Sequence, residues 1–169
     1  MPELQIRQAI PSDLPDVVRI YNHYAASSHA TFDTRPFTVE GRRDWFEGFA
    51  GAGPYRLLVA EVASDIAGYT SSTRFRPKQA YHRSVETTVY LNPRYTGRGL
   101  GIRLYGALFE LLAEERQVHR AYGGVALPNP ASAALHERLG FRLVGTFKEV
   151  GYKFEKFWDV RWYEKNLSD

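Results

Sequence analysis

The stretch Arg94-Tyr95-Thr96-Gly97-Arg98-Gly99-Leu100-Gly101 lies between a β-rich run and the most regular helical pattern of the chain. The run over residues 85–91 ends at Asn92-Pro93, where proline cannot continue a central sheet ladder. From Leu100 to about Arg116, leucines return every three or four positions, which predicts an amphipathic helix. The glycines therefore stand where a strand passes into a helix N-terminus, and backbone N–H groups there can bind a phosphate.

The charges around this loop also favour an anion. Arg94 and Arg98 add positive charge to that of the helix dipole, which suits a pyrophosphate. A glycine turn that only starts a helix remains the alternative. A Walker loop is excluded because no Gly-Lys-Ser/Thr follows. A dinucleotide-binding Rossmann loop is disfavoured because it should open a repeated parallel βαβ array with a ribose-binding carboxylate downstream.

Periodicity predicts a mixed α/β chain in the order β-α-α-β-β-β-α-β-α-β-β. Strands are expected at residues 4–9, 55–62, 66–73, 85–91 and 120–126, from 141 onward and at 158–163. Helices are expected after an N-cap at Pro11-Ser12-Asp13 and at 39–49, 100–116 and 130–139. The chain has 169 residues and no repeat, low-complexity tract or linker. We therefore expect one layered domain over residues 1–169, with helices packed against a sheet.

Composition narrows the class of protein. Hydrophobic residues make up 44% of the chain and charged residues 24%, which is typical of a folded globular protein. The net charge of +3 comes from scattered arginines rather than a basic run, which disfavours a nucleic-acid partner. Without cysteine, disulfides, thiolate metal ligands and a cysteine nucleophile are excluded. No signal-type apolar segment or stretch of about eighteen apolar residues occurs, so we expect a cytoplasmic protein without a membrane partner.

Several motifs together point to a family. Arg94-x-x-Gly97-x-Gly99 after Val89-Tyr90-Leu91 resembles the acetyl-CoA motif of the GNAT superfamily of N-acetyltransferases. The chain is also similar to its phosphinothricin and methionine sulfoximine acetyltransferase branch, over nearly its whole length. That similarity lies in Glu86-Thr87-Thr88-Val89-Tyr90-Leu91-x-Pro93-Arg94, Gly97-Arg98-Gly99-Leu100-Gly101-x-x-Leu104-Tyr105, Leu135-His136-Glu137-x-Leu139-Gly140-Phe141, Asn22-His23-Tyr24, Leu58-Val59-Ala60-Glu61-Val62 and Trp158-Asp159-Val160.

The resemblance implies the acyl-CoA N-acyltransferase fold, a central, mostly antiparallel twisted sheet flanked by helices, with acetyl-CoA as co-substrate. It implies that the pyrophosphate meets the amides of Gly97, Arg98, Gly99, Leu100, Gly101 and Ile102 beside Arg94, and that pantetheine pairs with Val89 and Leu91 like an added strand. Asn129 matches the position from which the family's asparagine reaches the pantetheine arm. The alternative for Asn129 is a helix cap.

Glu86 is the expected general base. An amine attacks a thioester only in its neutral form, so a proton acceptor is needed near the acetyl carbon. Strand alternation places Glu86, Thr88 and Tyr90 on one face, and the related branch has its base at this position. We expect Glu86 to act directly or through a water, and backbone N–H groups near Tyr90 or Leu91 to stabilise the oxyanion. Alternatively, Glu86 is a strand carboxylate satisfied by an arginine or by solvent.

His136 stands where the wider superfamily places the tyrosine that protonates the departing thiolate, and the phosphinothricin-like branch has histidine there. An imidazole can donate or relay this proton. The alternative is a structural histidine bonded to neighbouring backbone or stacked on an aromatic ring. The remaining histidines, His23, His29, His82 and His119, lack metal-ligand spacing, so no metal is expected.

Arg76 matches a position associated with the substrate carboxylate in related methionine-analogue acetyltransferases, and a guanidinium binds such a group bidentately. An exposed loop arginine is the alternative. Phe32 and Tyr81 are candidates for the pocket wall or for core packing, and Thr88 is a candidate substrate contact beside Glu86. We therefore expect direct acetylation of the primary amine of a small amino-acid-like molecule by a homodimer, the form usual for similar proteins. The alternatives are acetylation of a protein N-terminus or a polyamine, and a non-catalytic CoA-binding sensor.

Overall fold

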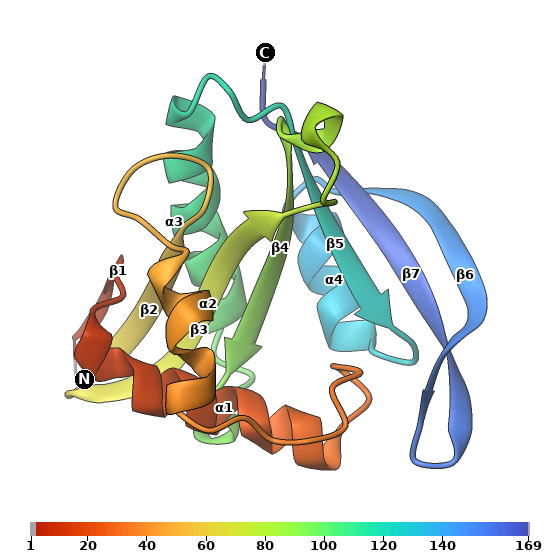
Figure 1. Ribbon diagram of the computed structural model, residues 1–169, viewed down its shortest axis with the longest axis horizontal. Coiled ribbons are helices and arrows are strands. Elements are labelled where there is room, and N and C mark those ends of the chain that lie inside the picture. Colours follow the sequence, from red (N-terminus) through yellow and green to blue (C-terminus); the bar gives the residue numbers. More distant parts are fainter. Residues whose placement is uncertain (1–2, 169) are drawn as a thin grey trace.

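A computed structural model describes residues 3–168, so Met1, Pro2 and Asp169, which belong to the expected domain 1–169, lie outside the described residues. One seven-stranded sheet runs through the molecule in the order β1-β2-β3-β4-β5-β7-β6 (Figure 1). Every neighbouring pair is antiparallel except β4 and β5, which are parallel. The expected mixed, mostly antiparallel sheet is confirmed.

The order of the elements also matches the expected one. Its strands are β1 (Leu4–Gln8), β2 (Leu57–Val62), β3 (Asp65–Arg74), β4 (Ser84–Leu91), β5 (Arg120–Ala126), β6 (Arg142–Lys153) and β7 (Lys156–Asn166), and its helices are α1 (Leu14–Ser27), α2 (Arg43–Glu47), α3 (Leu100–Glu114) and α4 (Pro130–Arg138). Short 3-10 turns precede α1, α2, β4 and α3. No helix among residues 3–168 is long and apolar enough to cross a membrane.

Two apolar cores cover opposite faces of the sheet. On one face, Leu108 and Leu112 of α3 pack with Val85, Ala121 and Val125, and residues of α4 join this cluster. On the other face, residues of α1 and α2 pack with β2, β3 and β4. Strand alternation explains the division, because neighbouring strand residues point to opposite faces.

Three predictions of local structure need correction. The expected helix over residues 39–49 is only a 3-10 turn followed by α2, because Arg42 leaves helical geometry between them, with φ of −107° and ψ of 2°. Asp13 precedes α1 but does not cap it; its carboxylate instead accepts hydrogen bonds from Arg7 and from the Ile10 N–H. The last two strands are longer than expected and join at a tight turn where Phe154 and Glu155 have positive φ.

The strands β4 and β5 pair only briefly. Their parallel ladder covers Ser84 to Glu86 on β4 and Arg120 to Tyr122 on β5, while β5 stays paired with β7 along its whole length. Beyond Glu86 the two strands separate. The sheet therefore contains an open gap in its centre, next to the N-terminus of α3.

Gly68 tests the packing of α3 on the sheet. A Cβ built at Gly68 would lie 2.6 Å from a Leu91 methyl group, 2.9 Å from the Tyr90 carbonyl and 3.3 Å from a Leu104 methyl group. We expect Gly68→Ala to lower the free energy of unfolding, measured by urea denaturation, by about 1–3 kcal/mol. The added methyl group would overpack the interface.

The matched control is Gly106→Ala, in α3 itself, where nothing lies within 4 Å of the added Cβ. Alanine there should stabilise the protein by up to about 1 kcal/mol, because glycine is a poor helix residue. Equal denaturation midpoints for Gly68→Ala and the parent protein would show that α3 does not pack on β3 as described.

Candidate active site

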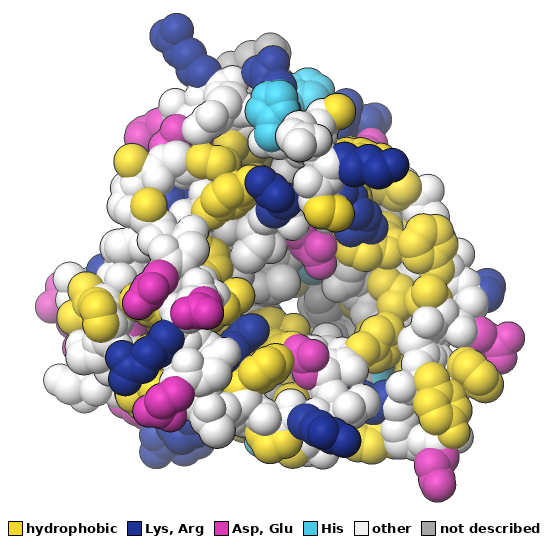
Figure 2. Space-filling model, in the orientation of Figure 1, with side chains coloured by type: hydrophobic (Ala, Val, Ile, Leu, Met, Phe, Trp, Pro, Cys, Tyr) yellow, Lys and Arg dark blue, Asp and Glu magenta, His cyan; other side chains and the backbone are white. Residues whose placement is uncertain are grey.

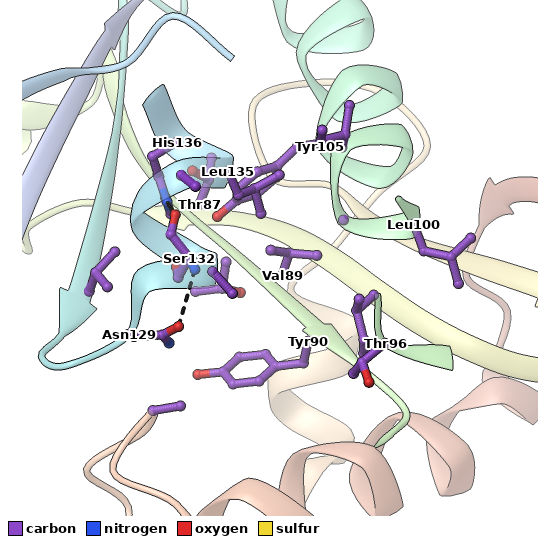
Figure 3. Close-up of a pocket in the computed structure, with 18 of the residues that line it drawn as sticks. Thr87, Val89, Tyr90, Thr96, Leu100, Tyr105, Asn129, Ser132, Leu135 and His136 are labelled. Carbon is purple, nitrogen blue, oxygen red and sulfur yellow. Dashed lines mark hydrogen bonds between the residues drawn. The ribbon is translucent and has the colours of Figure 1, made fainter. Parts of the chain in front are cut away.

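A cavity of about 490 Å³ occupies the gap between β4 and β5. Side chains from β4, from the start of α3 and from α4 converge on it (Figure 3). Of the predicted cofactor residues, the lining contains Val89, Tyr90, Leu91, Gly97, Gly99, Leu100, Gly101, Ile102 and Asn129. The structure thus brings together residues separated by about forty positions in the sequence.

The glycine loop forms an open cradle at one end of this cavity. Gly97 and Gly99 have φ of +73° and +74°, a left-handed conformation that favours glycine, and nothing lies within 4 Å of a Cβ built at either position. Gly99 is the N-cap of the 15-residue helix α3. The first N–H groups of α3 therefore point toward the cradle, together with the positive end of the helix dipole, which suits a phosphate.

Neither predicted cationic partner of the loop lines the cavity. The Arg94 guanidinium forms an ion pair with Asp65, which also accepts a hydrogen bond from the Tyr95 hydroxyl. The Arg98 guanidinium lies over the Tyr95 ring, 5.3 Å from its centre. A different cation, Arg138 at the end of α4, lines the cavity instead. Sequence reasoning missed Arg138 because only the fold brings the end of α4 next to the start of α3.

The edge of β4 that faces the gap offers unpaired backbone. The Leu57 carbonyl accepts from Ala9 on the β1 side, and the Asn92 N–H donates to Ala67 on the β3 side. Alternation from these two bonds directs the backbone groups of Tyr90 toward β3, and those of Val89 and Leu91 into the gap. The Leu91 carbonyl accepts from the Tyr24 hydroxyl at 2.6 Å. Leu91 N–H, rather than that of Tyr90, is thus directed into the cavity.

Asn129 caps a helix and also lines the cavity, so its two predicted roles are compatible. Its side-chain Oδ1 accepts from the Ser132 N–H at 3.1 Å, which caps α4, and the residue also lines the cavity (Figure 3). The cap leaves its amide Nδ2 group as a free donor among the described residues. Its use as a helix cap therefore does not exclude its use as a cofactor contact.

A second cavity of about 350 Å³ adjoins the first. It is lined by His29, Ala30, Phe32, Glu86, Gly124, Ala126, Phe147, Val150, Val160 and Trp162. Ala30, Gly124 and Ala126 line both cavities, so the two meet in the centre of the sheet. In the space-filling view this face is hollowed near its centre (Figure 2). Such paired cavities can hold two reactants whose reacting groups meet between them.

Glu86, the last residue of β4 that pairs with β5, supplies a carboxylate to the second cavity. Burial raises the pKa of the Glu86 carboxyl, and the Arg76 guanidinium, whose Nη1 lies 4.0 Å from the carboxylate, opposes part of the rise. Arg76 does not line the cavity itself; it lies over the Phe75 ring, 4.2 Å from its centre, and donates to the Phe75 carbonyl. A carboxylate with a raised pKa is a suitable proton acceptor near neutral pH.

His136 is 3% exposed and lines the first cavity. Its Nδ1 lies 2.7 Å from the Ser132 carbonyl, and because a carbonyl only accepts, Nδ1 carries the proton. Nε2 has no hydrogen-bond partner among the described residues and faces Gly123, where any Cβ would collide with the ring. Burial lowers the pKa of the imidazole, partly offset by the bond to Ser132. His136 is therefore a neutral ring with a free acceptor nitrogen.

The remaining predicted substrate residues divide between the two cavities. Phe32 lines the second cavity, whereas Thr88 lines the first and exchanges a hydrogen bond with the Ser71 hydroxyl at 2.9 Å. Tyr81 lines neither; it is 44% exposed and packs edge-on against Phe75. Residues 3–168 contain no group of three His, Cys, Asp or Glu side chains that could hold a metal ion, and the expected absence of a metal stays a prediction.

A cradle that suits phosphate, an open strand edge and a half-buried carboxylate in the adjoining cavity are the features expected of an enzyme that transfers an acyl group from a CoA thioester. Comparison with known proteins agrees. Residues 17–141 match the model of the acetyltransferase (GNAT) family. A phosphinothricin N-acetyltransferase from Streptomyces coelicolor is 52% identical over 98% of this chain and 97% of its own length.

Two further relatives extend the comparison. An L-methionine sulfoximine/L-methionine sulfone acetyltransferase from Pseudomonas aeruginosa is 33% identical over 96% of this chain and 94% of its own. A phosphinothricin acetyltransferase from Sinorhizobium meliloti, solved with acetyl-CoA, superposes with a TM-score of 0.92 at 28% identity, over 98% of this chain and 89% of that one. The chain belongs to the acetyltransferase (GNAT) family, whose members use acetyl-CoA, and it is an N-acetyltransferase.

The cradle can be tested by a side chain at Gly99. Valine is strongly disfavoured at a φ of +74°, so Gly99→Val should distort the start of α3 and raise the Kd for CoA at least about tenfold, as measured by calorimetry. Gly106→Val, the same change within α3 where no atom crowds the new Cβ, is the control and should bind CoA like the parent. Unchanged affinity in Gly99→Val would count against the cradle.

Proposed function

We propose that this chain acetylates the α-amino group of a small amino-acid-like molecule of the phosphinothricin or methionine sulfoximine type, with acetyl-CoA as the acetyl donor. One observation carries the proposal. Glu86 opens onto the cavity that adjoins the cofactor-sized gap, and the Arg76 guanidinium lies 4.0 Å from its carboxylate. A base and a carboxylate-binding cation side by side match the two ionic groups of an α-amino acid.

The first cavity is the proposed site of CoA. The amides from Gly97 to Ile102 would hold its pyrophosphate, and the gap-facing backbone of Val89 would pair with its pantetheine arm, since the Leu91 carbonyl already accepts from Tyr24. The Asn129 amide would donate to the same arm. When bound there, acetyl-CoA supplies a thioester whose acetyl group is open to attack by an amine.

Glu86 would remove the proton of the amine, directly or through a water. Its raised pKa makes the carboxylate a stronger base, and binding of a substrate carboxylate to Arg76 would neutralise the cation that lowers this pKa. The Leu91 N–H, which points into the gap, would donate to the oxygen on which negative charge develops.

His136 would relay a proton on the cofactor side. In the resting state its Nε2 is an acceptor, and its lowered pKa keeps the ring neutral. The ring therefore must first accept a proton before it can pass one to a leaving thiolate. This order distinguishes His136 from a tyrosine in the same place, which carries its proton at the start.

We further propose that the protein is a homodimer. The strand β6 and its hairpin expose large apolar side chains, each more than half exposed: Leu143, Val144, Phe147, Val150, Tyr152, Phe154 and Phe157. The strand β6 is also an edge of the sheet. A second copy of the chain would cover this apolar surface. A cytoplasmic location remains a prediction from the sequence.

The substrate class can be tested by release of the CoA thiol from acetyl-CoA with phosphinothricin, methionine sulfoximine, methionine sulfone, spermidine and an N-terminal peptide. The amino-acid analogues should be turned over selectively. Arg76→Gln should raise their KM about tenfold or more, because a carboxylate loses its cationic partner, whereas the neighbouring Arg74→Gln should not. Turnover of spermidine or peptide alone would reject the proposed substrate class.

The role of Glu86 predicts a pH dependence. Because the base must be deprotonated, kcat/KM should fall as the pH drops through the Glu86 pKa, with a midpoint above the ordinary glutamate value of about 4.3. Glu86→Gln should lower turnover by about 10²–10⁴-fold, remove this acid limb and leave the Kd for CoA unchanged. The same acid limb in the variant would assign the base to another group.

A further inference from the structure

Lys153, the last residue of β6, places a charged group in the protein interior. It is only 4% exposed, although lysine is seldom fully buried. Its ammonium donates to the carbonyls of Ser28 at 2.7 Å and Thr31 at 2.8 Å, and to that of Tyr24 at 3.5 Å. Burial lowers the pKa of this amine, and the Asp33 carboxylate opposes the change. The three carbonyls compensate the ammonium for its lost water.

The segment held by Lys153, residues 28–32, forms a wall of both cavities; we call it the acceptor loop. Ala30 lines both cavities, and His29 and Phe32 line the second, into which Glu86 opens. This loop follows α1 and lies beside the β6–β7 hairpin (Figure 1). The position of the loop therefore sets the shape of the space in which an amine would meet Glu86.

The same hairpin touches the acceptor loop at two further places. The His29 ring stacks on Trp158 at 4.2 Å and 2°, and the Trp158 Nε1–H donates to the Lys153 carbonyl at 2.8 Å. The Phe32 ring packs against Gly151 so closely that any Cβ there would collide with it. The side chains of the acceptor loop thus pack against the hairpin. Lys153 of the hairpin, in contrast, donates hydrogen bonds to the backbone of the loop.

Strand alternation gives this hairpin two different faces. Gly151 and Lys153 point inward to the acceptor loop and are buried, whereas Tyr152 and Phe154 point outward and are more than half exposed. Three other bonds also hold the loop: Tyr21 to the Thr31 hydroxyl at 2.6 Å, His29 to the Pro128 carbonyl at 2.8 Å, and the Ser28 N–H to the Tyr24 carbonyl at 3.0 Å. The first two involve loop side chains, and the third joins the start of the loop to α1. Lys153 bridges the loop backbone at Ser28 and Thr31.

We propose that Lys153 is a positioning residue for the amine acceptor: its ammonium ties the backbone of the acceptor loop to the hairpin and so holds one wall of the cavity that Glu86 also lines. The proposal rests on the proposed function in taking the second cavity as the amine site. Lys153 itself lines neither cavity. Its loss should therefore weaken amine binding while the glycine cradle, which lies on another part of the chain, still binds acetyl-CoA.

Steady-state kinetics of Lys153→Met test this division, since methionine keeps an apolar stem of similar length without the ammonium. We expect the KM for the best amine to rise about tenfold or more, with kcat and the KM for acetyl-CoA within about threefold of the parent. Lys148→Met is the matched control, because Lys148 lies on the same strand, is 77% exposed and pairs only with Asp159. An unchanged amine KM, or equal rises in both KM values, would overturn the proposal.

A rescue experiment separates the ammonium from the packing of its stem. The chain contains no cysteine, so Lys153→Cys introduces a single thiol, which can be alkylated with 2-bromoethylamine in the unfolded protein before refolding. The product carries an amine at the length of a lysine side chain. Restoration of the parent amine KM by alkylation supports the role of the ammonium. A refolded, alkylated protein that keeps the KM of the unalkylated variant contradicts it.

Hydrogen exchange provides a readout that needs no turnover. In Lys153→Met the hydrogen-bonded amides of Ser28 and Ala30 should exchange at least about tenfold faster than in the parent, while those of residues 97–102 remain unchanged. Unchanged exchange in the acceptor loop would overturn the proposal even if the enzyme is active. Faster exchange in a protein that acetylates none of the amino-acid analogues would instead support the link between Lys153 and the loop, and reject the proposed substrate.

Discussion

The separation of β4 and β5 after a three-residue parallel ladder is the constraint on which the site depends. A parallel pair that continued would use the backbone groups of Val89 and Leu91 and leave no gap in the sheet. Two adjacent glycines keep the space open. Gly123 admits the His136 ring on one face of β5, and Gly124 lies against the Trp162 indole on the other. The two cavities therefore meet at this point, where the proposed function brings cofactor and acceptor together.

The pKa shifts of Glu86 and His136 follow from this geometry. Glu86 is the last residue of β4 that pairs with β5, and it also pairs with Thr73 of β3, while its side chain faces the second cavity. Partial burial raises its pKa, and Arg76 limits that rise. The His136 pKa moves in the opposite direction, because burial disfavours its cationic form. The first shift makes the Glu86 carboxylate a stronger base, and the second keeps the His136 ring neutral with Nε2 as an acceptor.

Much of this arrangement could be predicted from the sequence. The order of strands and helices follows from periodicity, and the glycines at 97 and 99 mark the start of α3 because few other residues adopt their conformation. The charged residues next to the glycine loop in the sequence did not predict which cation lines the cavity. Arg94 is adjacent to the cradle in sequence but pairs with Asp65, and Arg138 reaches the cavity through packing of α4. Lys153 was also missed, because its three partners precede it by more than 120 residues.

The central claim is that the gap between β4 and β5 is the slot for the pantetheine arm of CoA. A crystal structure of the protein with CoA tests it most directly. The account predicts pantetheine amides hydrogen-bonded to the backbone of Val89, with the pyrophosphate at the amides of residues 97–102. CoA bound elsewhere, with the gap closed or filled by side chains, would contradict the account.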